Sequence, residues 1–201
     1  EFANMLDRNP DADLGFCSSM IVDGNTEEIT AYYPSSNSLV NLRKLPENLF
    51  MGNKIGAPSA TIFRKTALTF DNKLKWLVDL EFYIRLLTKN KNFAFILRPL
   101  IATTNNADHQ VTSESLNNNV ELFENLYVYN KLMLDHTENI ALIDHFKLLF
   151  HRFGIKSKKD IEKEGLTEFL ALPLFKNENV FHYKPKGIVS RYLLPEKINY
   201  L

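Results

Sequence analysis

Asp79 and Glu81 are the side chains in this sequence whose type and position point most directly to acid–base chemistry. They stand near the start of a segment, 76–87, in which apolar residues recur at helical spacing. A carboxylate in the first turn of a helix is favoured by the unpaired N–H groups and by the helix dipole. At the edge of a pocket, such a carboxylate can accept a proton from a substrate hydroxyl. The alternative is that Asp79 only caps its helix.

A helix and the strand before it are the elements that must position these acids. The apolar stripe consists of Leu77, Leu80, Ile84 and Leu87, with Tyr83 beside it. This spacing predicts a helix over 76–89. Upstream, 56–65 is typical of a short strand entered through a Gly/Pro turn. Downstream, 93–104 predicts a strand in which Pro99 fits an edge position or a bulge.

The first fifty residues predict a helix, a hairpin and a second helical stretch. The helix covers residues 1–9 and ends at Asn9-Pro10, because proline cannot continue its hydrogen bonds. Strands over 14–22 and 28–33 flank the turn signal Asp23-Gly24-Asn25 and would pair as a hairpin. Polar residues followed by leucines over 35–53 predict one or two short helices, broken at Pro46.

The C-terminal part of the sequence predicts helices. Two longer helices are expected over 114–135 and 139–153, with Gly154 as the stop signal of the second. Shorter helices are expected over 158–165 and 166–175, with a break near Pro173. The histidines at 136, 145, 151 and 182 lack metal-ligand spacing and are interpreted as solvated or core residues.

Three segments, taken in their order and spacing, carry a resemblance to a known family. They are Gly56 to Lys65, then Phe70-Asp71, then Asp79 to Leu86. Together they resemble the second half of a bacterial family 2 glycosyltransferase of the GT-A fold. In that family a strand ending in Arg or Lys leads to a helix of the pattern E-D-x-D-x-x-x-R-L, whose first acid is replaced here by Val78.

The resemblance runs from the start of the chain to about Thr112 and implies an α/β fold. Residues 1–112 would form a partial GT-A-like sheet with flanking helices, the acceptor-side part of such a domain. Residues 113–201 would form a C-terminal helical extension with an aromatic and basic tail. Since the chain begins with what looks like the end of a helix, we expect the nucleotide-binding half to precede Glu1 in a longer protein.

The resemblance also implies roles for particular residues of the acceptor-side part. Asp79 matches the catalytic aspartate, Glu81 the second acid and Arg85 the helix arginine, the last two as substrate-binding residues. Ser59 could bind a sugar hydroxyl or merely form the turn, and the turn is favoured. Arg64 could face the donor phosphates or pair with a surface acid.

A divalent cation, Mn²⁺ or Mg²⁺, is implied together with the nucleotide-binding half. His109 is the candidate metal ligand and Gln110 a candidate substrate contact, in a loop that resembles the one after the last sheet strand of these enzymes. The alternative is that this loop only opens the next helix. The triplet Asp11-Ala12-Asp13 looks like the family's metal signature, but its place between a helix and a strand favours an ordinary turn.

Composition narrows the function classes. Lys+Arg and Asp+Glu both total 24, so the formal net charge is zero and gives no indication of nucleic-acid binding. A single cysteine excludes an internal disulfide and a cysteine-cluster metal site. We expect a cytoplasmic protein, with peripheral contact to the inner face of a membrane through the basic and aromatic segments as an open alternative.

The expected function is therefore that of an inverting glycosyltransferase fragment, inactive alone. The full enzyme would move a sugar from a nucleotide-diphosphate sugar to a hydroxyl acceptor, in surface polysaccharide or glycoconjugate synthesis. A non-catalytic helical module that binds a partner protein is the alternative. A nucleotidyltransferase is disfavoured, because the glycine-rich phosphate loop that it needs is absent from the sequence.

Overall fold

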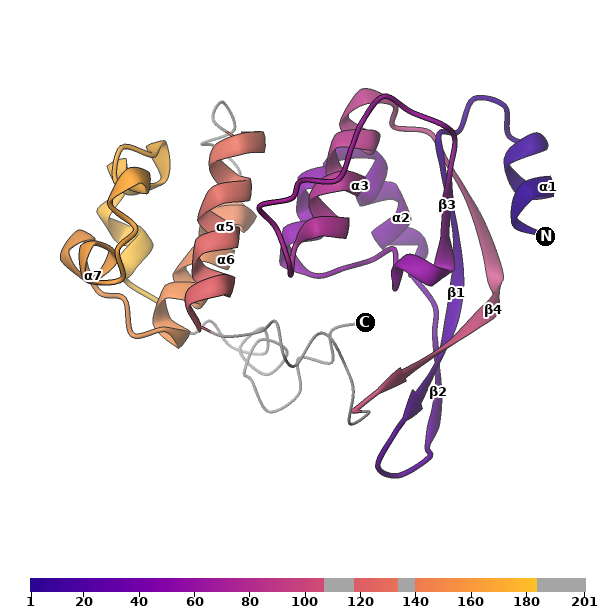
Figure 1. The fold of residues 1–201 in the computed structure, drawn as a ribbon, viewed down its shortest axis with the longest axis horizontal. Helices are drawn as coiled ribbons and strands as arrows, with labels where there is room; N and C mark the ends of the chain where they lie inside the picture. The colour runs from indigo at the N-terminus through magenta and orange to yellow at the C-terminus, as the bar shows by residue number, and fades with distance from the viewer. Residues whose placement is uncertain (107–117, 134–139, 184–201) are drawn as a thin grey trace. The chain divides into compact units, whose positions relative to one another are not determined.

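The computed structural model describes residues 1–106, 118–133 and 140–183, which divide between two compact units. Residues 1–106 belong to the first unit, and the later described residues belong to the second. Figure 1 shows the fold of each unit. The predicted site residues His109 and Gln110 lie outside the described residues.

The first unit is built on a four-stranded mixed sheet. Its strands are β1 (Leu14–Asp23), β2 (Ile29–Tyr32), β3 (Thr61–Phe63) and β4 (Phe93–Asn105). β4 pairs in parallel along the whole length of β1. The antiparallel partners β3 and β2 therefore share the other edge, β3 beside Leu14–Phe16 and β2 beside Ser19–Val22. β1 is thus the central strand, and the predicted α/β class and hairpin are confirmed.

Pro99 lies opposite Ser18, where the register between β1 and β4 shifts on both sides of Ser18. Among the described strands β4 pairs only with β1, so it is an edge strand there. Proline has no N–H to donate to a ladder and is tolerated in such places. The prediction of an edge position or a bulge for Pro99 is confirmed.

Helices cover both faces of this sheet (Figure 1). They are α1 (Phe2–Asp7), α2 (Ser36–Lys44), α3 (Val78–Lys89) and the 3-10 turns η1 (Pro46–Met51) and η2 (Pro58–Ala60). α1 packs through Met5 and Leu6 on one face, near Ala94, while α2 and α3 cover the other. The helices predicted around Pro46 are confirmed. The strand predicted over 56–65 is shorter, because Pro58 begins a 3-10 turn and only Thr61–Phe63 pairs.

The buried face of α3 is wider than the predicted stripe. Leu77, Ile84 and Leu87 are buried as expected, whereas Leu80 is only partly buried. Phe82 and Leu86 are buried as well, Phe82 against the rings of Phe63 and Phe70. A helix whose apolar surface is this broad is held firmly against its unit. Its first turn is therefore a rigid place for a functional group.

The second unit is helical within its described residues. It contains α5 (Asn118–Met133), α6 (Ile140–Arg152), α7 (Lys158–Lys163) and the 3-10 turns η3 (Thr167–Phe169), η4 (Pro173–Lys176) and η5 (Glu178–Phe181). Gly154 follows α6 with a positive φ of 69°, which confirms the predicted stop. The stretch predicted as helix over 166–175 forms the two 3-10 turns η3 and η4, and η4 begins at Pro173, where a break was predicted. Phe150 stacks with Phe175 and Phe181 in the core of this unit.

No helix within residues 1–106, 118–133 or 140–183 is both long enough and apolar enough to cross a lipid bilayer.

Candidate functional site

Asp79 is the second residue of α3, and its side chain does not form an ordinary N-cap. The N-cap position belongs to Leu77, which makes no side-chain cap. An N-cap side chain accepts a hydrogen bond from the second or third helical N–H. Asp79 Oδ1 instead accepts one from the next residue, Leu80 N, at 2.9 Å. The carboxylate thus lies at the helix start without closing it.

The surroundings of Asp79 favour its protonated form. Its side chain is partly buried, and burial raises the pKa of the carboxyl above the ordinary value of 3.8, more than the backbone N–H bonds lower it. Within the described part of the chain, Asp79 makes no ion pair with a Lys, Arg or His. A raised pKa makes a carboxylate a stronger base, closer to what proton abstraction near neutral pH requires.

A pair of hydrogen-bonded hydroxyl groups, Tyr83 on α3 and Thr61 on β3, lies near Asp79. Tyr83 follows Asp79 at the i+4 position, and its hydroxyl lies 3.1 Å from Thr61 Oγ1 on β3. Thr61 donates its only hydroxyl proton to the carbonyl of Pro58 at 2.7 Å, so the bond between the two hydroxyls is donated by Tyr83. Burial raises the pKa of Tyr83, and the nearby Asp79 carboxylate raises it further. Tyr83 therefore stays protonated and ties α3 to β3.

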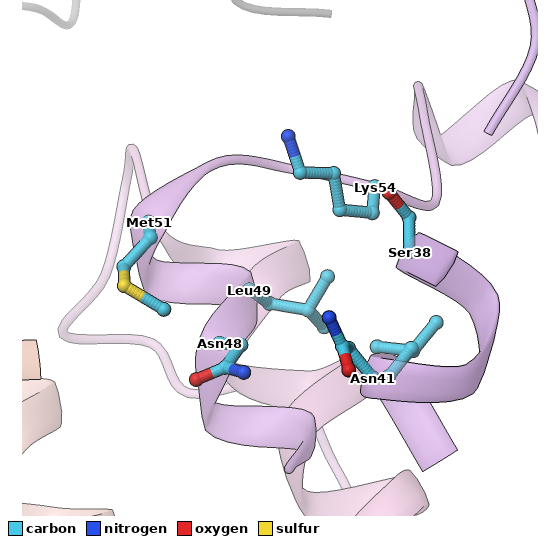
Figure 2. Close-up of a pocket in the computed structure, with 7 residues that line it drawn as sticks. Ser38, Asn41, Asn48, Leu49, Met51 and Lys54 are labelled. Atoms are coloured by element: carbon cyan, nitrogen blue, oxygen red, sulfur yellow. The ribbon is translucent and has the colours of Figure 1, made fainter. Parts of the chain in front are cut away.

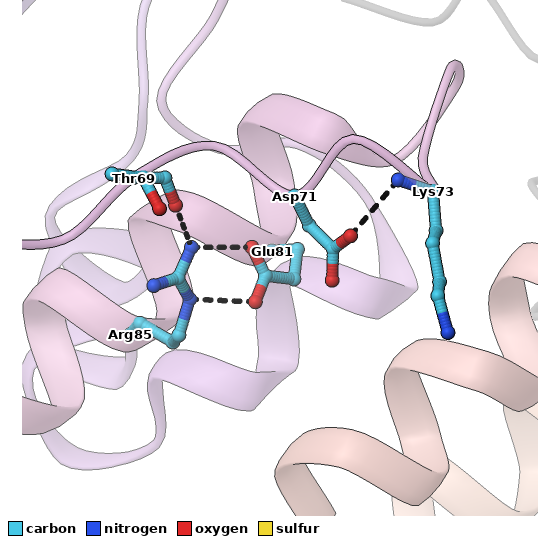
Figure 3. Close-up of polar contacts among 5 residues, drawn as sticks. All are labelled: Thr69, Asp71, Lys73, Glu81 and Arg85. Carbon is cyan, nitrogen blue, oxygen red and sulfur yellow. Dashed lines mark hydrogen bonds and ion pairs between the residues drawn. The ribbon is translucent and has the colours of Figure 1, made fainter.

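Glu81 and Arg85 are already engaged with each other (Figure 3). The Glu81 side chain is 0% exposed; its two oxygens lie 2.6 Å from Arg85 Nε and 2.9 Å from Arg85 Nη2. Arg85 also donates to the carbonyl of Thr69 at 2.6 Å. The pair joins α3 to the loop before it, in which Asp71 Oδ1 accepts a bond from Lys73 N at 2.9 Å. A ligand could reach Glu81 only by displacing Arg85, so the geometry gives both residues a positioning role.

Arg64 takes neither of the two partners considered for it. Its guanidinium donates to the carbonyls of Ala12 at 2.9 Å, Leu6 at 2.7 Å and Asn9 at 3.4 Å. These are carbonyl groups at the C-terminal end of α1 and in the turn that follows, where cations are favoured. Arg64 therefore fastens α1 to β3. Ser59 is exposed in η2, in agreement with the turn interpretation.

Asp11 and Asp13 lie in the turn between α1 and β1, as predicted. The side chain of Asn90, at the end of α3, donates to Asp13 Oδ2 at 3.1 Å and to the carbonyl of Asp11 at 2.8 Å. Within the described ranges no group of three or more His, Cys, Asp or Glu residues is arranged to hold a metal ion. The described residues therefore do not fit a metal site, and the proposed ligand His109 is outside them.

Sequence reasoning missed two buried serines on the central strand. Ser18 is 0% and Ser19 3% exposed, and neither hydroxyl has a hydrogen-bond partner. Gly56, with a φ of 102°, lies against Ser19, since a Cβ placed on it would be 3.6 Å from Ser19 Oγ. Two adjacent serines inside an apolar strand were the available signal. Buried hydroxyls without partners are uncommon and mark places where a further polar group could be accommodated.

Comparisons of the chain with protein-family models, with curated proteins and with solved structures found no match. The interpretation of the site therefore depends on the geometry described above and on the short motifs of residues 56–86.

Proposed function

We propose that this chain is the acceptor-side part of an inverting glycosyltransferase with a GT-A-like fold, and that Asp79 is its catalytic base. The observation that carries the proposal is the state of the Asp79 carboxyl. It stands in the first turn of a firmly packed helix, is partly buried, has a raised pKa and makes no ion pair among the described residues. A carboxylate kept only to stabilise the fold would be expected to have a cation or an N-cap bond.

The reaction that fits this base is a direct displacement at a sugar carbon. The acceptor hydroxyl loses its proton to the Asp79 carboxylate as its oxygen forms a bond to the anomeric carbon. The bond between that carbon and the nucleoside diphosphate breaks, and the diphosphate leaves with the electron pair. The configuration at the anomeric carbon is inverted, and Asp79 later releases the proton to water.

The other residues of the α3 region support this role by position. Tyr83 and Thr61 hold α3 against β3, and Glu81 with Arg85 holds the loop before α3. Rotation of the Asp79 carboxylate away from the acceptor oxygen would lower the rate of sugar transfer, since proton transfer requires hydrogen-bond distance between the two groups. Substrate contacts by Ser59, Arg64, Glu81 and Arg85 are not needed for this scheme.

Donor binding and the divalent cation are assigned to chain outside the described residues. A diphosphate leaving group needs cationic groups or a metal ion to absorb its charge. The described residues do not form such a site. We propose that the nucleotide-diphosphate sugar and Mn²⁺ or Mg²⁺ bind to a longer form of the protein, on the cytoplasmic side of a membrane.

The test is a pair of measurements on this chain and on a form extended upstream in its gene. Titration with UDP and GDP, with and without Mn²⁺, should show binding by the extended form only. Transfer or hydrolysis of nucleotide sugars by the extended form should fall about 10²–10⁴-fold in Asp79→Asn, the range for loss of a general base. Asp144→Asn, an exposed acid on α6, is the matched control and should leave the rate unchanged.

Two outcomes would contradict the proposal. Sugar transfer that is insensitive to Asp79→Asn would remove Asp79 from the reaction. Absence of nucleotide binding in both forms would favour the second candidate, a helical module that binds a partner protein.

A further inference from the structure

We draw no further inference here: the strongest candidate, the small pocket between α2 and η1 (Figure 2), carries nothing because Asn48 Oδ1 in its wall is buried out of reach of a ligand and the exposed Lys54 does not by itself identify one.

Discussion

Each of the two units buries a glutamate against an arginine, but the two pairs have different neighbours. In the first unit Glu81 and Arg85 lie four residues apart on α3. In the second unit Glu121 of α5 pairs with Arg152 of α6, so that the pair joins two helices. The difference that matters is a third acid. Asp79 stands two residues before Glu81 and has no arginine among the described residues.

Several buried polar side chains of the second unit bond to one another. Asn125 donates to the carbonyl of Glu121 at 2.9 Å, and its side-chain oxygen lies 3.1 Å from His145 Nε2. Burial and the nearby Arg152 charge lower the pKa of His145 to about 4, so the imidazole is neutral at pH 7 and can donate to Asn125. A network of this kind specifies how helices pair. Burial alone therefore does not mark a functional acid, and the proposed role of Asp79 depends on the missing cation.

The largest expected effect comes from removing either arginine. Arg85→Met removes the guanidinium that faces the buried Glu81 carboxylate, and Arg152→Met removes the one that faces Glu121. Each should lower the free energy of unfolding by about 3–5 kcal/mol, measured by urea denaturation. The double variant Glu81→Leu/Arg85→Met should recover most of the loss. A loss below about 1 kcal/mol in Arg85→Met would mean that Glu81 is not held as a buried ion.

Acid should destabilise the second unit through His145. Its folded pKa of about 4 lies below the ordinary 6.5. Between these two pH values the imidazole is protonated in the unfolded chain but not in the folded chain. The stability associated with neutral His145 is complete above pH 6.5 and falls as the pH drops toward 4. The expected loss is up to about 3 kcal/mol, because each whole-number difference between the folded and unfolded pKa corresponds to about 1.4 kcal/mol.

Urea midpoints measured between pH 7.5 and pH 4 would show this loss. His145→Gln, which cannot titrate, is the comparison and should have a flatter profile over that range. Identical profiles for the two proteins would contradict a depressed pKa for His145.

A smaller effect is expected from Tyr83→Phe, which removes the hydroxyl bonded to Thr61. The loss should be about 1 kcal/mol of unfolding free energy, typical of one neutral hydrogen bond. In the extended form, the proposed enzyme should also lose rate, because this bond positions the helix that carries Asp79. Thr61→Val should resemble Tyr83→Phe in both measurements, and a normal rate in both variants would limit the bond to stability.

The smallest stability change, and the one of opposite sign, is expected from Asp79→Asn. Because the folded pKa of Asp79 is raised, its ionised form destabilises the fold at pH values above that pKa, and neutral Asn should raise the urea midpoint at pH 7. The gain should disappear below pH 3.8, where Asp79 is protonated in both states. Asp13→Asn, which alters an acid bonded to Asn90, should not raise the midpoint. A lower midpoint for Asp79→Asn would mean that the acid stabilises its helix.

Local patterns of the sequence predicted most elements of the fold. Helical spacing of leucines identified the α3 region, Pro99 marked the irregular edge strand, and Gly154 ended α6. These signals depend on neighbours close in the chain, where residue type acts directly on the backbone. The sequence by itself also placed Asp79 in the first turn of its helix.

Only the tertiary structure decided which polar side chains are already engaged. Arg64 bonds a carbonyl 58 residues away, and Glu81 is fully enclosed beside Arg85 and the loop at Thr69. The bare hydroxyls of Ser18 and Ser19 and the pocket at Asn48 likewise arise from distant segments that meet on folding. A side chain's residue type states what it can bind. The packing of the whole unit determines which partner it binds, because burial removes the water molecules that would otherwise compete for its hydrogen bonds.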